Sequence, residues 1–266
     1  MSREEGVVVV DRPVPLVARL RINRPDKRNA IDLEVRQALM DAIDRLLGDR
    51  SVRALVFGGV GGMFSAGGDL ASMAGLDADG ARARMQHIHR LCRQIAAIPL
   101  PVVCAVEGVG AGAAVGLALL GDCIVVGEGT KILFPFLKIG LTPDWGQLLT
   151  LPARIGPAQA RRVLSAGIPV SGAEAQRIGL ADALTPDDDV MAAALRKAQE
   201  LAALPSLAFE RTKVRLGLSA TLLAQELERE EADQVICLQS AEFAEGFAAF
   251  KDKRAPDFVN LVENRP

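Results

Sequence analysis

Two glycine-rich loops, each at the end of an apolar run, constrain the fold of this chain most strongly. GGVGGMFSAGGDL (58–70) continues the run ALVFGG, and EGVGAGAAVG (107–116) follows VVCAV. Both runs are typical of buried strands, and glycine or alanine after a strand lets the backbone approach another group with its N–H groups free. Tight packing of a helix against a sheet would explain one such loop. Two loops of the same kind favour a site made of backbone N–H donors.

Strand and helix patterns alternate through the first two thirds of the chain. Apolar or alternating segments predict strands, and amphipathic segments predict helices, one of them with Asp32 as its cap. The expected strands are 7–10, 16–22, 54–59, 102–106 and 122–127, and the expected helices are 32–47, about 80–97 and the LALL segment after the second glycine loop. This alternation is typical of an α/β fold.

The pattern changes past about residue 184, where the strand signals end. Four helices are expected there, at 187–204, 206–217, 221–238 and 241–250. The charged run ELEREEAD (226–233) predicts a solvated helix face. We therefore expect a core over 1–195 and a helical region over 196–266, which packs on a neighbouring subunit or forms a simple lid.

Composition argues against several classes of protein. The net charge of −2 gives no basic field for nucleic acid, and no apolar run is long enough to span a bilayer. The N-terminal MSREEG lacks the basic segment of a signal peptide, and the four cysteines form no CxxC pair, so we expect a cytoplasmic protein with reduced, buried thiols. The only histidines, His87 and His89, point apart on a helix, which argues against a histidine-based metal site.

Two ligands suit glycine loops of this kind: a dinucleotide, or a reacting carbonyl oxygen. GAGAAVG follows a strand and opens a helix, as in a nucleotide-binding turn, and Glu128 ends the next strand. However, its spacing is GxGxxxG rather than GxGxxG, and the chain has no GxxxxGK(S/T) motif. In the second interpretation, one N–H group from each loop points at a carbonyl oxygen that gains negative charge, with a helix dipole behind the second donor.

The chain resembles the crotonase, or enoyl-CoA hydratase/isomerase, superfamily over nearly its whole length. The matching segments are NRPDKRNAI (23–31), FSAGGDL (64–70), PVVCAVEGVGAGAAVGLALLGD (101–122), LKIGLTPDWG (137–146), LPARIG (151–156) and FAAFKDKRAPDF (247–258). The resemblance implies a spiral of ββα turns with a C-terminal α-helical trimerisation region, assembled as a trimer or a dimer of trimers. It also implies a coenzyme A thioester as substrate, with no separate cofactor.

The resemblance also implies roles for single residues. The N–H groups of Ala66 and Ala113 would bind the thioester oxygen. Coenzyme A would contact residues near the glycine loop and in the C-terminal helix, namely Lys27, Arg28, Gly68, Asp69, Leu70, Phe250 and Lys253. Phe136 and Trp145 would line the acyl pocket, and His89 would be a helix-face or pocket-wall residue.

Two departures from the family pattern bear on mechanism. Enoyl-CoA hydratases add water with two glutamates, whose positions correspond to Gly116 and Phe136 here. Without these carboxylates the paired acid and base that activate water are missing, so a hydratase is disfavoured. The same Phe136 replaces the glutamate of one class of enoyl-CoA isomerase.

Asp144 is the remaining candidate for acid–base chemistry. In GLTPDWGQ (140–147), Thr142 is a candidate cap and Pro143 suits the first helical position, so Asp144 is expected in the first turn of a helix. The segment resembles the ring-1,2-epoxyphenylacetyl-CoA isomerase branch, which has a catalytic aspartate at this place. We therefore predict an acyl-CoA isomerase in which Asp144 moves a proton through a thioester enolate held in an oxyanion hole.

Alternatives from other classes remain open. The 4-chlorobenzoyl-CoA dehalogenases also carry an aspartate here, as a nucleophile, with a histidine that aligns with His89. A dehalogenase or thioester hydrolase would use Asp144 and His89 in this way, although the dehalogenases' ring-activating tryptophan aligns with Phe136. A homologue that binds acyl-CoA without turnover would keep the same loops. A Rossmann-type NAD enzyme would explain the glycines, but FSAGGDL argues against it.

Overall fold

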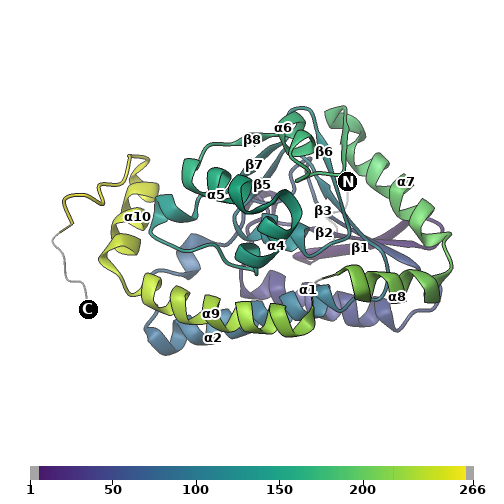
Figure 1. Cartoon of the computed structure of the whole chain (residues 1–266), viewed down its shortest axis with the longest axis horizontal. Coiled ribbons are helices and arrows are strands. Elements are labelled where there is room, and N and C mark those ends of the chain that lie inside the picture. Colours follow the sequence, from purple (N-terminus) through teal and green to yellow (C-terminus); the bar gives the residue numbers. More distant parts are fainter. Residues whose placement is uncertain (1–5, 218, 262–266) are drawn as a thin grey trace.

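The computed structural model describes residues 6–217 and 219–261, which form two sheets (Figure 1). The larger sheet has the strand order β1-β2-β3-β4-β6-β9, and the smaller has the order β5-β7-β8. β1 is antiparallel to β2, and the neighbours from β2 to β9 are parallel. The strands are β1 (Val8–Val14), β2 (Val17–Ile22), β3 (Ala54–Gly59), β4 (Val102–Val106), β5 (Val109–Ala111), β6 (Cys123–Gly127), β7 (Lys131–Leu133), β8 (Val170–Ser171) and β9 (Ala183–Thr185).

Helices connect the parallel strands and form the C-terminal region. They are α1 (Leu33–Leu47), α2 (Ala78–Ala96), α3 (Ala113–Leu119), α4 (Gln147–Ile155), α5 (Pro157–Ala166), α6 (Gly172–Arg177), α7 (Val190–Ala202), α8 (Ser206–Leu216), α9 (Ala220–Leu238) and α10 (Ala241–Asp252). Asp32 caps α1 as expected, because its side chain accepts the N–H of Val35 at 3.0 Å. The first strand extends beyond the expected 7–10 to Val14, which pairs with Val17.

Alternate residues of β3 face two separate cores. Leu55 and Phe57 pack in the core that includes α1 and α2, whereas Ala54 and Val56 pack against α7 on the opposite face. The period of two follows from strand geometry. Because both faces are covered, every residue of β3 is buried, which explains why ALVFGG is continuously apolar.

The two glycine-rich loops meet where β3 and β4 end. The N–H of Ser65 donates to the Val109 carbonyl at 3.0 Å, and the Ser65 carbonyl accepts the N–H of Ala111 at 3.1 Å. Gly67 permits this approach: its φ is +93°, and a Cβ atom there would lie less than 3.0 Å from the Ala111 carbonyl oxygen. Only glycine satisfies both the left-handed φ and the close backbone approach.

The C-terminal helices pack back onto the core of the same chain. α9 lies beside α2, and α10 contacts the turn Phe136–Ile139 (Figure 1). The predicted boundary between 195 and 196 falls inside α7, whose residues pack on the large sheet. Packing therefore places the end of the core after Ala202, and the helical region begins with α8.

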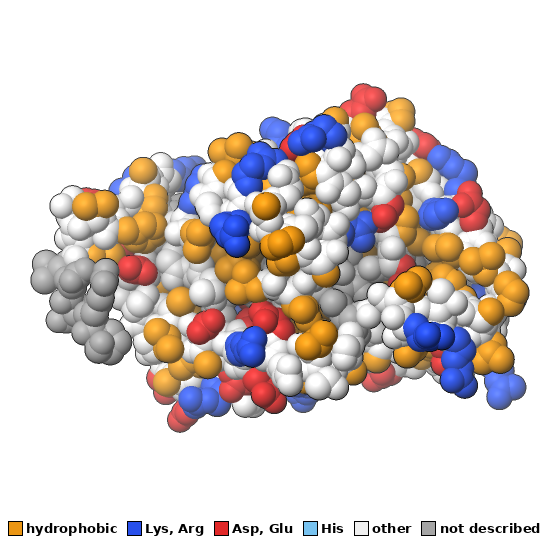
Figure 2. All heavy atoms as spheres, in the orientation of Figure 1, with side chains coloured by type: hydrophobic (Ala, Val, Ile, Leu, Met, Phe, Trp, Pro, Cys, Tyr) orange, Lys and Arg blue, Asp and Glu red, His pale blue; other side chains and the backbone are white. Residues whose placement is uncertain are grey.

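α8 carries the clearest unpartnered surface of the C-terminal region. None of its side chains is buried, and Leu207, Val214 and Leu216 are exposed. Figure 2 shows hydrophobic and basic side chains next to one another over this end of the molecule. Exposed apolar residues on a helix suit a role in assembly. The trimer, or dimer of trimers, stays a prediction.

The burial of the cysteines and the lengths of the apolar helices can be compared with what the composition predicts. Cys92, Cys104 and Cys123 are buried free thiols as expected, whereas Cys237 is only half-buried. Within residues 6–217 and 219–261, no helix combines the length and the apolar character needed to cross a membrane.

Candidate active site

Asp144 lies in an irregular loop between β7 and α4. Helix α4 begins at Gln147, and its N-cap is Gly146, with a φ of 69°. Trp145 also has a positive φ, of 60°, which is unusual for a bulky residue. The prediction that Thr142 caps a helix with Asp144 in its first turn is therefore wrong. Two consecutive left-handed residues separate Asp144 from the helix.

The Asp144 side chain is buried with unmet hydrogen-bonding capacity. The residue is 5% exposed, and its Oδ1 has no hydrogen-bond partner among the described residues. Burial raises the pKa of Asp144 to about 7, and the nearby Glu230 carboxyl adds to the rise, while Arg84 and His89 oppose it. A carboxyl group with this pKa and a free oxygen is suited to take and return a proton near neutral pH.

Glu230, on α9, holds the loop that carries Asp144. Its Oε1 accepts the N–H of Trp145 at 2.9 Å, and its Oε2 accepts the N–H of Gly146 at 2.7 Å. A left-handed bulky residue persists only where its surroundings hold it. Glu230 therefore stabilises the backbone turn that presents Asp144.

His89, on α2, contacts the same glutamate. Its Nε2 lies 2.9 Å from Oε1 of Glu230, so one proton lies between the two side chains. Burial lowers the pKa of His89 to about 4 and raises that of Glu230 to about 8. Gln234, further along α9, donates to the Thr142 carbonyl at 2.6 Å and ties the other end of the loop.

Sequence reasoning missed Glu230, because ELEREEAD was predicted to be a solvated face. That prediction is wrong at this residue, which is 3% exposed. The missed signal is spacing: the buried side chains of α9 recur every three or four residues, and Glu230 falls within this stripe. The stripe consists of Leu223, Leu227, Glu230, Gln234 and Leu238.

We expect Glu230→Gln to loosen the loop. Both oxygens of the Glu230 carboxyl group accept a hydrogen bond, whereas an amide has a single acceptor oxygen, so the N–H of Trp145 or Gly146 loses its partner. The free energy of unfolding should fall by about 1–3 kcal/mol. Turnover should fall with little change in KM, because Asp144 is no longer fixed; denaturant titration and steady-state kinetics measure the two effects.

Glu231→Gln is the matched control for this substitution. Glu231 is the next residue on α9, and its Oε1 lies 3.6 Å from Nε of Arg82 in a partly exposed pair. Loss of such a pair changes stability by about 1 kcal/mol or less. Equal effects of the two substitutions would contradict a specific role for Glu230.

Some backbone N–H groups of the glycine loops donate hydrogen bonds within the protein, and others are free. The N–H of Ala66 donates to the Arg28 carbonyl at 2.9 Å. The prediction that Ala66 supplies an oxyanion donor is therefore wrong, because its donor is already used. The N–H groups of Gly68 and Ala113 have no partner in the part of the chain that the structure describes. Gly68, expected only as a coenzyme A contact, therefore has a free N–H next to Ala66.

The two free donors belong to segments that touch. A Cβ atom on Gly67 would lie 3.4 Å from the backbone nitrogen of Ala113. Ala113 is the first residue of α3, so the positive end of that helix dipole lies behind its N–H. Free N–H groups from two adjoining loops, one at a helix start, are the geometry that stabilises a developing oxyanion.

Phe136 and Trp145 lie beside the start of α3. A Cβ atom on Gly112 would lie 3.7 Å from Cζ of Phe136. A Cβ atom on Gly116 would lie less than 3.0 Å from Cβ of Trp145 and 3.1 Å from Nε2 of Gln147. Both aromatic side chains are buried, and Trp145 fills space that a longer residue at position 116 would need.

Unsatisfied polar atoms gather around Asp144. Four buried atoms with no hydrogen-bond partner among the described residues are Oγ1 of Thr142, Oδ1 of Asp144, Oε1 of Gln147 and Nη1 of Arg84. Three of them belong to one short segment, and Arg84 acts on the pKa of Asp144 through its charge. Because buried polar atoms are nearly always paired, such a group indicates a place where a polar ligand binds.

Comparison with known proteins shows the family of the chain. Residues 15–261 match the family model described as enoyl-CoA hydratase/isomerase. The chain belongs to the enoyl-CoA hydratase/isomerase family. Its fold is the crotonase type, since it superposes with a TM-score of 0.85 on the crystal structure of an enoyl-CoA hydratase from Mycobacterium avium subsp. paratuberculosis K-10, at 32% identity and covering 96% of this chain and 99% of the other.

Relatives within the family carry different activities in their names. The 1,2-epoxyphenylacetyl-CoA isomerase of Escherichia coli is 32% identical over 91% of this chain and 95% of its own length. A probable enoyl-CoA hydratase of Rhodobacter capsulatus is 35% identical over 91% of this chain and 94% of its own length. Family membership is therefore shown, while the choice of reaction depends on the residues of this chain.

The segments expected to hold coenzyme A in this family lie against the first glycine loop. The exposed residues Lys27 and Arg28 lie in the turn whose Arg28 carbonyl accepts the N–H of Ala66 in the loop. Asp69 caps the short helix Leu70–Ser72 by accepting the N–H of Ala71 at 3.1 Å. These residues share one region with the free N–H of Gly68, and their contact with coenzyme A stays a prediction.

Phe250 and Lys253 lie apart from these residues. Both are exposed, on α10 and at its C-terminal end, where Lys253 has a left-handed φ of 55°. No described hydrogen bond or ion pair connects either side chain to the Asp144 loop. Contact with coenzyme A in a neighbouring subunit therefore stays a prediction.

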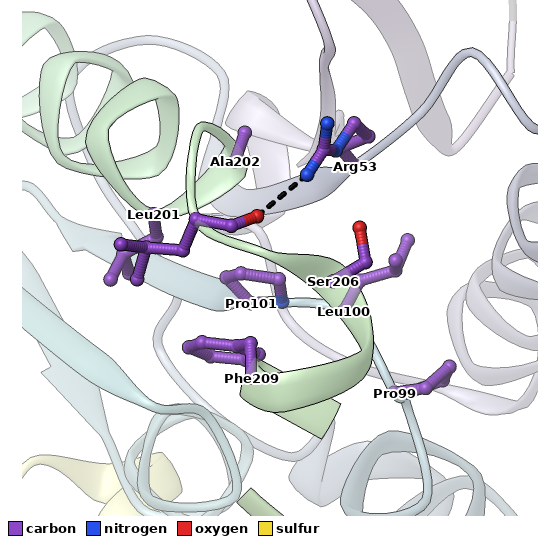
Figure 3. Close-up of a pocket in the computed structure, with 9 residues that line it drawn as sticks. Arg53, Pro99, Leu100, Pro101, Leu201, Ala202, Ser206 and Phe209 are labelled. Carbon is purple, nitrogen blue, oxygen red and sulfur yellow. Dashed lines mark hydrogen bonds between the residues drawn. The ribbon is translucent and has the colours of Figure 1, made fainter. Parts of the chain in front are cut away.

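A further pocket lies away from this site. Figure 3 shows a small pocket where α7 leads into α8, in which Arg53 donates to the Leu204 carbonyl at 2.6 Å. Its volume of about 10 Å³ admits little more than a water molecule. Within the described ranges, no three His, Cys, Asp or Glu side chains gather as a metal site would require.

Proposed function

We propose that the protein is an acyl-CoA isomerase. The thioester oxygen accepts hydrogen bonds from the N–H groups of Gly68 and Ala113. Asp144 moves a proton between two carbon atoms of the acyl group. The observation that carries the proposal is the buried Asp144 carboxyl, which has a free oxygen and a pKa raised to about 7.

In the proposed reaction the Asp144 carboxylate removes a proton from the carbon next to the thioester carbonyl. The electron pair moves onto the thioester oxygen, giving an enolate that the two N–H groups stabilise. The proton now on Asp144 is delivered to a carbon further along the acyl chain, the double bond shifts, and the aspartate is ionised again. No atom is gained or lost, so one carboxyl group is sufficient.

The environment of position 116 supports an isomerase over a hydratase. Hydration needs a second acid or base, and a glutamate at Gly116 would meet Cβ of Trp145 and the side chain of Gln147. Phe136 offers no carboxylate at the other position. Glu230 is buried nearby, but its two oxygens already accept the N–H groups of Trp145 and Gly146.

We therefore expect no appreciable hydration of crotonyl-CoA. A screen of 3-enoyl, 2-enoyl and arylacetyl thioesters, read by mass and by chromatography, tests the proposal. An isomerase changes retention without changing mass, a hydratase adds water, and a hydrolase releases coenzyme A. Hydration at rates usual for enzymes would show that other residues supply the acid and base.

The hydrolase or dehalogenase alternative requires Asp144 as nucleophile and His89 as base. It is the weaker candidate because Nε2 of His89 is engaged with Glu230 at 2.9 Å and burial lowers the pKa of His89. Transient covalent labelling of Asp144 by the acyl group would favour it. Thioester binding without any turnover would favour the non-catalytic alternative.

The isomerase name of the Escherichia coli relative supports the proposal. The cytoplasmic location and the absence of a separate cofactor stay predictions.

A further inference from the structure

Arg84 has a buried guanidinium for which the proposed reaction gives no role. It lies in the first half of α2, one turn before the fully buried Ile88 and one turn after the buried Ala81, so it shares their inward face. The residue as a whole is half-buried, but its Nη1 is fully buried and has no hydrogen-bond partner among the described residues. An unpaired buried cation is costly, which indicates a missing partner.

The guanidinium lies between the glycine loop and the Asp144 loop. A Cβ atom on Gly68 would lie 3.4 Å from Nη2 of Arg84. Burial lowers the pKa of Arg84, while the charges of Asp144 and Asp69 raise it. Neither carboxylate forms an ion pair with Arg84 within 4.0 Å in the described ranges.

A second buried guanidinium lies near Arg84. Burial and the charge of Arg84 lower the pKa of the buried Arg36, and the charges of Asp32 and Asp144 raise it. Glu230, with its pKa raised to about 8, and the neutral His89 contribute little negative charge at neutral pH. Asp144 is half-protonated near pH 7. Arg36 has the nearby charges of Asp32 and Asp144, whereas Nη1 of Arg84 has no hydrogen-bond partner among the described residues, so a bound anion would supply the partner that Arg84 lacks.

We propose that Arg84 binds a carboxylate at the far end of the acyl group, so that the preferred substrates are coenzyme A monothioesters of dicarboxylic acids. The inference rests on the proposed function, because it assumes that the thioester oxygen lies at Gly68 and Ala113. A planar guanidinium matches a carboxylate with two parallel hydrogen bonds, which a neutral oxygen cannot accept equally well.

Calorimetric binding of chain-matched, unreactive thioesters tests the proposal. The pairs are glutaryl-CoA with pentanoyl-CoA and adipyl-CoA with hexanoyl-CoA, with 6-hydroxyhexanoyl-CoA as a neutral-oxygen probe. For at least one pair the wild-type protein should bind the dicarboxylic thioester about 10-fold or more tightly than its methyl-ended partner, as expected for a hydrogen-bonded charge pair. Arg84→Gln should abolish this preference and leave the methyl-ended thioester within about 3-fold.

Arg82→Gln is the matched control, because Arg82 lies on the same helix with a 47% exposed side chain paired with Asp79. It should retain the preference. Arg84→Lys keeps the positive charge and should retain part of the preference for the dicarboxylic thioester. It replaces Arg84→Gln in the experiment if the glutamine variant does not fold. Equal binding of each chain-matched pair by the wild-type protein, or a preference that survives in Arg84→Gln, would overturn the proposal.

Two further outcomes would also overturn it. Equal binding of 6-hydroxyhexanoyl-CoA and adipyl-CoA would show that Arg84 accepts any oxygen. A large loss of 3-enoyl-CoA turnover in Arg84→Gln, with affinities unchanged, would show that Arg84 acts on the enolate itself. Failure of the proposed function looks different: no thioester would bind, or none would be isomerised, whatever residue stands at position 84.

Discussion

Asp144→Asn is expected to reduce isomerase turnover by roughly 100- to 10,000-fold, the usual range for loss of a general acid–base. The amide keeps the shape of the side chain but cannot take a proton from carbon. The assay is isomerisation of a 3-enoyl-CoA, or of whichever thioester the screen identifies. Affinity for a thioester should change little, because Gly68 and Ala113 bind through their backbone N–H groups.

The same substitution should not destabilise the protein above neutral pH. Burial raises the pKa of Asp144 from its ordinary 3.8 to about 7, so the folded protein holds this proton more tightly than the unfolded chain. Stability is therefore lost as pH rises from about 3.8 through about 7, and the uncharged asparagine avoids that loss. We expect the melting temperature at pH 8 to be unchanged or higher while turnover collapses.

The activity of the wild-type protein should increase with pH as Asp144 loses its proton, whereas its stability decreases. The basic form of Asp144 is ionised, so kcat/KM, which reports the free enzyme, should fall as pH decreases through about 7, and Asp144→Asn should abolish this limb. If turnover of the variant remains within a few-fold of the wild type, Asp144 is not the base, and His89 becomes the next candidate.

Gly67→Ala is expected to reduce turnover by about 100-fold or more. A methyl group there would lie less than 3.0 Å from the Ala111 carbonyl oxygen, so the two glycine loops must separate. The N–H groups of Gly68 and Ala113 would then no longer point at one atom. A displacement of about 1 Å is enough for a loss of this size. Steady-state kinetics and thermal melting of the same preparations measure the effect.

Gly75→Ala provides a control for backbone strain alone. Gly75 has a φ of +73°, comparable to the +93° of Gly67, but no atom lies within 4 Å of a Cβ placed there. Both substitutions should lose about 1–2 kcal/mol from left-handed strain. Only Gly67→Ala should lose turnover beyond what its loss of stability explains. Similar kinetics for the two variants would argue against a paired oxyanion hole.

The elements that sequence predicted well depend on local or periodic signals. The run ALVFGG is continuously apolar because helices cover both faces of β3, and Asp32 caps α1 through a hydrogen bond to Val35 three residues away. The residues that make up such a signal lie within a few positions of each other, so the signal can be recognised without knowing the tertiary structure. The glycine loops and the absence of glutamates at Gly116 and Phe136 were visible for the same reason.

The identity of the free N–H donors depended on the tertiary structure. Ala66 and Gly68 are neighbours in a loop of small residues, and sequence does not show which N–H group is already bonded. Folding brings the Arg28 carbonyl to Ala66 and leaves Gly68 free. Likewise, the helix start predicted at Thr142 is replaced by a left-handed turn at Trp145 and Gly146.

Sequence by itself determined the α/β core, the family and the candidate aspartate, because each can be recognised from short segments with strong local patterns. Only the tertiary structure showed that Glu230, far along the chain, holds the Asp144 loop, and that Arg84 is buried without a partner. Both roles arise from contacts between residues that are distant in sequence. Such contacts also set the burial that raises the pKa of Asp144, since desolvation depends on every segment packed around the carboxyl group.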